Sequence, residues 1–179
     1  PDTYRFTKGT SDLDILGRAA QAMDRILAEE WRDRAPGLPL ENPDQALVLA
    51  SIIEKETSQA SERPTIAGVF IRRLQLGMRL QTDPTVIYGL GAAFDGDLRR
   101  NDLTRDTPYN TYTRHGLPPT PIALPGRAAI NAALHPEAGD SLYFVAKGDG
   151  GHWFSPTREE HNQAVRRYQL GQGTEGGKP

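Results

Sequence analysis

Apolar residues recur every three or four positions along the first part of the chain, a pattern typical of an amphipathic helix. They are Leu13, Leu16, Ala20, Met23, Leu27 and Trp31. Ser11, with Asp14 three residues later, resembles a capping box that uses Asp in place of Glu. The pattern therefore predicts a first helix over residues 11–34.

Further helices are predicted wherever a capping residue or a proline precedes an apolar run. Asn42 followed by Pro43 starts the second helix, and Ser155 followed by Pro156 starts the last. Asp83 is expected to cap a short helical turn through Tyr88. The predicted ranges are 42–57, 61–76, 83–88, 125–134 and 155–170.

Between these helices the pattern changes twice. Residues 89–120 are rich in Gly, Pro, Asn, Asp and Thr and show no clean period, which predicts a long ordered loop of the kind that is more often functional than idle. Residues 142–145 and 152–154 are β-prone and flank Gly148-Asp-Gly-Gly, a hairpin signal. The predicted fold class is α+β, with four or five helices around a small antiparallel sheet.

The amino-acid composition excludes several classes of protein function. The 179 residues fit one domain, and 25% charged and 37% hydrophobic residues indicate a soluble globular protein. A net charge of −2 gives no general attraction to nucleic acid. The absence of cysteine excludes disulfides, a thiol nucleophile and a thiolate zinc site. Without thiolates or metal-binding histidine spacing no metal is expected, and without a phosphate-binding or dinucleotide-binding glycine motif no cofactor is expected.

Histidines and arginines carry no recognisable site pattern. The histidines lack metal-binding spacing and are expected to be structural or surface residues, and most of the clustered arginines are expected on a solvated face. These residues are His115, His135, His152 and His161, and Arg72, Arg73, Arg99, Arg100, Arg105 and Arg114.

The first and last residues of the sequence predict how much of it belongs to the folded domain. The start, PDTYRF, lacks an initiator Met and a signal-peptide pattern, so the chain is expected to be a piece whose anchor or targeting segment lies upstream. The longest apolar run, residues 46–53, is far short of the roughly 20 residues that span a bilayer. Residues 1–170 are expected to form the domain, with 171–179 as a mobile tail.

The second predicted helix ends in two acids that face opposite sides. On a helical wheel Glu56 lies within about 20° of the mean apolar direction, whereas Glu54 lies about 180° away. Neighbours at i and i+2 cannot form the two-carboxylate cleft of an ordinary glycosidase. A carboxyl on a dry face has a raised pKa, so Glu56 alone could give a proton and later take one back. The alternative is that Glu56 bonds an arginine or a backbone amide and only anchors the helix.

A second cluster lies in the long loop. Tyr109-Asn-Thr-Tyr112 combines aromatic rings with hydrogen-bonding groups, which suits a sugar with apolar CH faces and N-acetyl groups. A packed loop anchored by its tyrosines explains the same residues equally well. Gln81 and Thr82 add polar side chains just before a helix start.

Eight short blocks combine uncommon residues in a fixed order. They are residues 50–57 (ASIIEKET), 61–63 (SER), 77–89 (GMRLQTDPTVIYG), 109–112 (YNTY), 116–119 (GLPP), 121–122 (PI), 135–136 (HP) and 142–145 (LYFV). Together they resemble the catalytic domain of the endolytic murein transglycosylases, the MltG or YceG-like family. The resemblance runs from residue 1 to about residue 168.

The resemblance implies a bacterial enzyme with a lysozyme-like active-site core. Such an enzyme cuts nascent peptidoglycan inside the strand, between N-acetylmuramic acid and N-acetylglucosamine, and leaves a 1,6-anhydromuramoyl end without using water. It limits strand length near the peptidoglycan polymerases, the penicillin-binding proteins. It also implies an upstream single-pass anchor in the cytoplasmic (inner) membrane and a LysM-like region, with this domain on the periplasmic side.

The resemblance places the catalytic acid/base in the segment matched by Glu54-Lys-Glu56. We expect Glu56 to be that residue, because Glu56-Thr57 resembles the Glu-Ser pair of other lytic transglycosylases, with Glu54 as the fallback. The expected substrate-binding residues are Gln81, Thr82, Tyr109, Asn110 and Tyr112. Two other functions stay open: a peptidoglycan-binding scaffold without catalysis, and a muramidase that hydrolyses the same bond.

Overall fold

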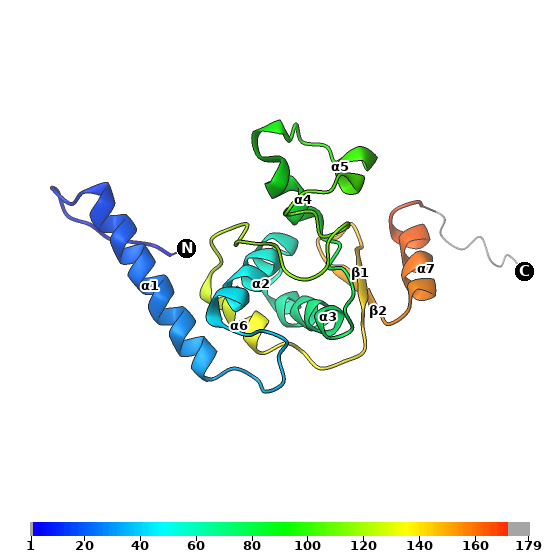
Figure 1. Cartoon of the computed structure of the whole chain (residues 1–179), viewed down its shortest axis with the longest axis horizontal. Helices are drawn as coiled ribbons and strands as arrows, with labels where there is room; N and C mark the ends of the chain where they lie inside the picture. Colours follow the sequence, from blue (N-terminus) through cyan, green and yellow to red (C-terminus); the bar gives the residue numbers. More distant parts are fainter. Residues whose placement is uncertain (1, 172–179) are drawn as a thin grey trace, which may run out of the picture.

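The computed structural model describes residues 2–171, which form seven α-helices, two short 3-10 helices and a two-stranded antiparallel sheet (Figure 1). The predicted α+β class is confirmed. The predicted number of helices is too low, because the segment expected to be loop also contains the five-residue helix α5 (Arg100–Thr104), and the turn expected at Asp83 is the full helix α4 (Asp83–Leu90). The tail predicted over residues 171–179 lies almost wholly outside the described residues.

The first two helices begin where the sequence predicts. α1 (Asp12–Arg32) has Ser11 as its N-cap with both bonds of a capping box. α2 (Pro43–Glu56) is capped by Asn42, whose side chain accepts from the amide nitrogen of Gln45 at 3.0 Å. α2 ends at Glu56 because Thr57 takes an extended conformation, with φ −143° and ψ 139°.

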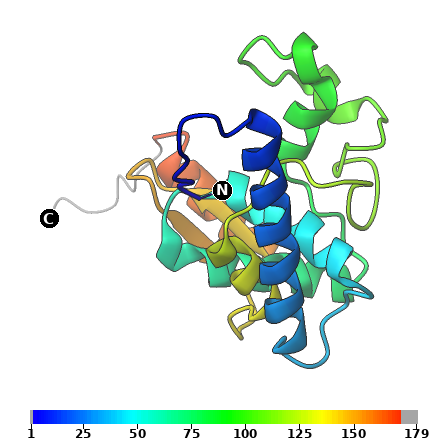
Figure 2. The same ribbon diagram turned by 90° about the vertical axis from the view of Figure 1, so that its left-hand side faces the viewer.

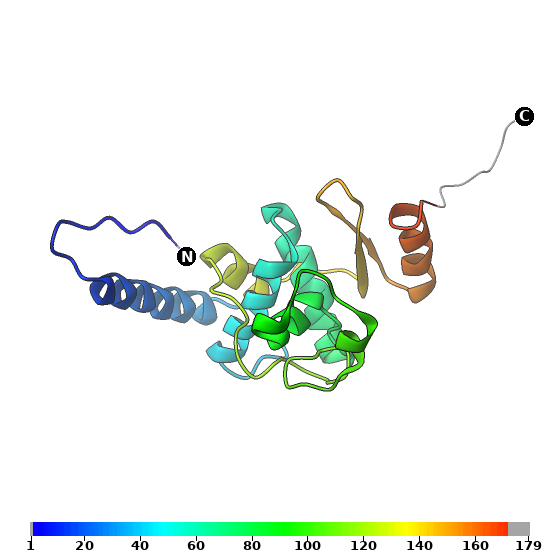
Figure 3. The ribbon, with the colours of Figure 1, turned by 90° about the horizontal axis from the view of Figure 1, so that it is seen from above.

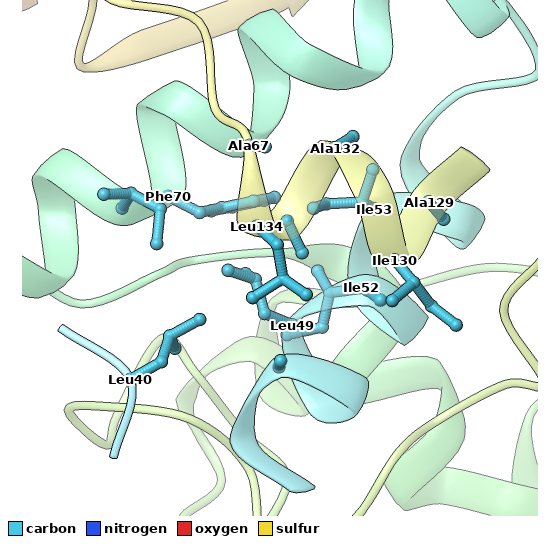
Figure 4. Packing of buried hydrophobic residues seen from close by; sticks show 14 of the residues in the cluster. Leu40, Leu49, Ile52, Ile53, Ala67, Phe70, Ala129, Ile130, Ala132 and Leu134 are labelled. Carbon is cyan, nitrogen blue, oxygen red and sulfur yellow. The ribbon is translucent and has the colours of Figure 1, made fainter. Parts of the chain in front are cut away.

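Three helices form the centre of the molecule. α2 packs against α3 (Arg63–Gln75) and α6 (Arg127–Leu134), and their apolar faces make one buried cluster (Figure 4). Figure 4 shows Leu134 and Ile130 of α6 pointing toward Leu49 and Ile52 of α2. Because so much of α2 is buried in this cluster, its C-terminal end is held on a rigid base.

α1 lies along one side of this centre (Figure 2). Its inward face carries the buried Leu27 and also Glu30, which accepts from Arg127 Nε and Asn131 Nδ2 of α6, each at 2.7 Å. No helix among residues 2–171 combines the length and the apolar character needed to cross a membrane.

A long excursion follows α3 and projects from the centre (Figures 1 and 2). It contains α4, the 3-10 helix η2 (Gly91–Ala93) and α5, and returns to α6 through residues 105–126. Another 3-10 helix, η1 (Ala60–Glu62), leads from α2 into α3. The excursion brings its two ends, around Thr82 and Thr111, side by side through a bond from the Thr82 amide nitrogen to Thr111 Oγ1 at 3.1 Å.

The sheet is the predicted hairpin. β1 (Tyr143–Ala146) pairs antiparallel with β2 (His152–Ser155) in the register Tyr143↔Ser155 to Ala146↔His152. Phe144 meets Phe70 of α3 edge to face at 5.8 Å between ring centroids, which joins the hairpin to the helical centre.

The last helix, α7 (Arg158–Tyr168), lies beyond the hairpin, at the opposite side of the molecule from α1 (Figures 1 and 3). The prediction that Ser155 caps this helix is wrong. Thr157 is the cap, and its Oγ1 accepts from the amide nitrogen of Glu160 at 3.2 Å. Ser155 is instead the last residue of β2, where it pairs with Tyr143 and is fully buried.

Candidate active site

A cavity of about 380 Å³ opens at the C-terminal end of α2. Its walls come from the end of α2, from α3, from the segment before α4, from the long loop, from the hairpin and from α7. The lining residues are Glu56, Arg73, Leu80, Gln81, Thr82, Asp83, Tyr112, Phe144, Val145, Ala146, His152, His161, Val165 and Gln169. A larger surface hollow, about 480 Å³, lies between Trp153 and α7, but it does not contain Glu56.

Glu56 is half-buried in this cavity, and its Oε1 accepts a hydrogen bond from Thr82 Oγ1. Burial raises the pKa of Glu56 to about 7. The bond from Thr82 acts against this rise, the negative charge of Asp83 adds to it, and the positive charges of His152 and Arg73 oppose it. A carboxyl with a pKa near 7 is protonated often enough to act as an acid and loses its proton readily enough to act as a base.

The segment that carries Thr82 is held firmly. Gln81 donates its amide N–H to the Thr111 carbonyl at 3.1 Å, and Thr85 Oγ1 lies 2.9 Å from Thr111 Oγ1. Gln81 has φ 51°, which is uncommon for a residue other than glycine. Such strained backbone clusters at functional sites, where surrounding structure holds it. The backbone of Gln81 is therefore held in place, and its exposed side chain lies in the cavity lining.

Asp83 and Tyr112 form a pair beside Glu56. The Tyr112 hydroxyl donates to Asp83 Oδ1 at 2.5 Å. Burial raises the pKa of Tyr112 above its usual value, and the bond to Asp83 adds to the effect, so the phenol stays protonated. The prediction that Asp83 caps α4 is wrong: Thr82 holds the cap position, without a side-chain cap bond, and Asp83 turns toward Tyr112.

Arg73 is buried under the cavity, which corrects the expectation of a solvated face for this arginine. Its Nε donates to the Leu142 carbonyl at 2.6 Å and its Nη1 to the Leu80 carbonyl at 2.7 Å. Burial lowers the pKa of Arg73, partly offset by the neighbouring Tyr143, Tyr112 and Glu56. This guanidinium therefore ties the hairpin to the segment before α4 and places positive charge near Glu56.

Two of the four histidines lie in the cavity lining. His152 Nδ1 lies 2.7 Å from Glu62 Oε2, and its amide nitrogen donates to Glu62 Oε1 at 2.8 Å. Burial alone would raise the pKa of Glu62, but these bonds lower it. His161 stacks on Tyr143 at 5.4 Å, and burial, together with the charge of Arg73, lowers its pKa. The sequence offered no spacing signal for either histidine.

Glu54, the other acid at the end of α2, is not among the residues that line the cavity. Its Oε2 accepts from the amide nitrogen of Gly126, the N-cap residue of α6, at 3.1 Å, and its Oε1 lies 3.6 Å from Arg63 Nη2. These contacts anchor α6 and α3 to α2. The predicted opposition of the two acids on α2 is thus present in the structure, and the arginine partner envisaged for Glu56 belongs to Glu54.

Of the loop residues predicted to bind sugar (Tyr109, Asn110 and Tyr112), only Tyr112 lies in the cavity lining. Tyr112 lines the cavity, whereas Asn110 is 1% exposed and its Nδ2 donates to the carbonyls of Asp102, Leu103 and Arg105. Tyr109 packs on Tyr88 at 4.9 Å, and its hydroxyl lies 2.6 Å from Thr120 Oγ1. The placement of Tyr109 and Asn110 favours the alternative of a packed loop.

Comparison with known families bears on what this cavity serves. A model of the YceG-like family matches residues 1–167. The chain belongs to the YceG-like family. A YceG-like protein from Listeria monocytogenes, known from a 2.6 Å crystal structure, is similar at a TM-score of 0.77 and 42% identity, over 91% of this chain and 52% of that one.

Two curated relatives of this YceG-like chain carry an enzyme name. An endolytic murein transglycosylase of Bacillus subtilis is 39% identical over 168 residues, which cover 94% of this chain and 46% of the relative. One of Streptococcus pneumoniae is 30% identical over 174 residues, covering 94% of this chain and 31% of the relative. The YceG-like chain thus spans less than half the length of both relatives.

Proposed function

We propose that this YceG-like domain is a lytic transglycosylase that cuts peptidoglycan glycan within the strand, between N-acetylmuramic acid and N-acetylglucosamine. The observation that carries the proposal is Glu56, a carboxyl with a pKa of about 7 in an open cavity at the end of α2. The names of the two relatives support the substrate.

In the proposed reaction, Glu56 performs both proton transfers. Protonated Glu56 gives its proton to the glycosidic oxygen as the bond to the muramoyl C1 breaks, and the sugar ring passes through an oxocarbenium-like state assisted by its N-acetyl group. The Glu56 carboxylate then removes the proton of the 6-hydroxyl as that oxygen bonds to C1. The 1,6-anhydro product forms without water, and Glu56 ends protonated again.

The neighbours of Glu56 suit these two steps. Thr82 orients the carboxyl through its hydroxyl, and Arg73 and His152 contribute positive potential that stabilises the charged form after the first transfer. Asp83, held by Tyr112, supplies negative charge next to the developing cation. Gln81 and Tyr112 are the side chains we assign to the sugar hydroxyl and N-acetyl groups.

Asp83 also favours a second candidate, a muramidase. A second carboxylate in the same cavity could activate water at C1, which gives a reducing end instead of an anhydro end. The test is to incubate the domain with purified, un-cross-linked glycan and weigh the products. Anhydro ends support the transglycosylase, products one water heavier support the muramidase, and no cleavage supports a binding scaffold.

Further properties follow from the resemblance and belong to the same proposal. Peptidoglycan lies outside the cytoplasmic membrane, so the domain is proposed to act on the periplasmic side, anchored by a segment upstream of residue 1. Proximity to penicillin-binding proteins is proposed on the same basis. Both are tested with the full-length protein, by membrane fractionation and by cross-linking to the polymerases in growing cells.

A further inference from the structure

One edge of β1 has no partner strand among residues 2–171, because the sheet there consists of β1 and β2 alone. An unpaired edge presents a row of N–H and C=O groups ready to bond another extended chain. We call this row the β1 edge, and its outward residues can be identified from the hydrogen-bond phase of the hairpin.

The hydrogen bond at the turn end of the β1–β2 hairpin shows which residues of β1 form bonded pairs with β2. Lys147 donates its N–H to the Gly151 carbonyl at 2.9 Å. Bonded and non-bonded pairs alternate in an antiparallel ladder, so with the observed register Val145 turns its main-chain groups toward β2, and Phe144 and Ala146 turn theirs away. The hydrogen bonds found elsewhere in the described chain use none of these outward groups.

The β1 edge is a wall of the cavity that holds Glu56, since Phe144, Val145 and Ala146 all line it. Its two outward residues are separated by about 7 Å along the strand, at roughly 3.4 Å per residue. This is the repeat of an extended peptide, in which every second residue offers an N–H and a C=O to the same side.

Charge at one end of the edge favours an acidic peptide. Arg73 lies next to the start of β1 through its bond to the Leu142 carbonyl and lines the cavity, although most of its side chain is buried. Its guanidinium bonds main-chain carbonyls and forms no ion pair among the described residues, so its charge is available to a carboxylate in the cavity. Peptidoglycan carries short peptides on its muramoyl units, and these peptides contain carboxylates.

We propose that the β1 edge binds the stem peptide of the substrate as a third strand of the sheet, with Arg73 near a peptide carboxylate. This inference rests on the proposed function, because the glycan bound at Glu56 brings its own peptide to β1. The enzyme therefore prefers peptide-bearing glycan to glycan stripped of its peptides.

The first test uses the wild-type domain on two un-cross-linked glycans of equal length, one with stem peptides and one stripped by an amidase. The expected kcat/KM is about tenfold higher on the peptide-bearing glycan, the equivalent of one or two main-chain hydrogen bonds. Free stem peptide is expected to inhibit competitively. Anhydro ends formed equally well from both glycans, without inhibition by the peptide, overturn the β1 inference alone. No cleavage of either glycan overturns the proposed function instead.

The second test removes one outward donor. Ala146 is exposed, and Ala146→Pro deletes its N–H at an edge position where proline is tolerated. The ratio of kcat/KM on peptide-bearing glycan to kcat/KM on stripped glycan is expected to fall about tenfold, because only the peptide-bearing substrate uses this donor. Trp153→Phe, in the paired strand with its side chain outside the cavity, is the matched control. Equal losses on both glycans by a variant that still folds by circular dichroism contradict the proposal, and if the variant does not fold, the wild-type comparison decides.

Discussion

The hydroxyl of Thr82 donates to Oε1 of Glu56, and the amide nitrogen of Thr82 donates to Oγ1 of Thr111. One residue thereby connects the end of α2, the start of α4 and the long loop. The position of the Glu56 carboxyl depends on this connection, so substitutions at Thr82 should affect catalysis through geometry as well as through the pKa.

Thr82→Val removes the hydroxyl but keeps the shape. Because the Thr82 bond acts to lower the pKa of Glu56, its loss should raise that pKa and move the alkaline limb of the pH–rate profile upward. The loss of orientation should lower kcat by roughly tenfold. Thr82→Ser, which keeps the donor, should restore both values. A Val variant with an unchanged profile would count against the role of this bond.

Glu56→Gln should abolish cleavage, with a loss of at least 10² to 10⁴ in kcat, the usual contribution of general acid–base catalysis. Quantifying anhydro ends by mass spectrometry measures the effect. Folding should be retained, because Gln has the same shape and can still accept from Thr82. If Glu54→Gln abolishes cleavage and Glu56→Gln does not, the assignment on α2 is wrong.

Glu56 should also make stability depend on pH. Its pKa is about 7 in the folded protein against an ordinary value of 4.5, so the folded state binds the proton more tightly than the unfolded state. The free energy of unfolding should therefore fall as pH rises from about 4.5 to above 7, by about 3 kcal/mol from this group. Urea denaturation of the wild type and of Glu56→Gln at pH 4.5 and pH 8 isolates this contribution as the difference between the two pH dependences.

Asp83 should set where activity declines at high pH. Its negative charge raises the pKa of Glu56, so Asp83→Asn should move the alkaline limb of kcat/KM to lower pH. Tyr112→Phe removes the bond to Asp83 but leaves the charge, so the limb should stay in place while kcat falls. Identical shifts in the two variants would show that the charge of Asp83 is not the cause.

Glu54 should matter for stability more than for chemistry. Glu54→Ala leaves the Gly126 amide and the Arg63 guanidinium without their acceptor, at a cost of about 1 to 3 kcal/mol in the free energy of unfolding. Glu54→Gln keeps an oxygen acceptor and should cost less. Cleavage per folded molecule should be unchanged in both, measured after correcting for the folded fraction.

Patterns local in sequence predicted what is local in structure. The apolar period of α2 located its buried face and the opposite directions of Glu54 and Glu56, and the hairpin glycines located β1 and β2. Arg73 could not be assigned in this way, because its partner at Leu142 lies 69 residues away in the chain. The same holds for His152 and Glu62, which are 90 residues apart.

Residue type alone left the role of Asn110 open and gave the wrong role for Ser155. An asparagine in a polar loop has the same composition signal whether it binds sugar or main-chain carbonyls, and Asn110 binds carbonyls. Ser155 before Pro156 has the same signal whether it caps a helix or ends a strand. Strand pairing with Tyr143 decided that case, and tertiary pairing is not visible in a local motif.

The hydrogen bonds from Arg73 to the carbonyls of Leu142 and Leu80 join parts of the chain that are synthesised at different times. Glu56 lies in the first third of residues 1–179, whereas another wall of its cavity is made by residues that are synthesised much later, between Phe144 and Gln169. A chain that ends before the hairpin therefore contains Glu56 but lacks this wall of the cavity. The cavity around Glu56 is complete only once the hairpin and α7 have been synthesised and have folded, so a chain terminated before the hairpin should lack this cavity.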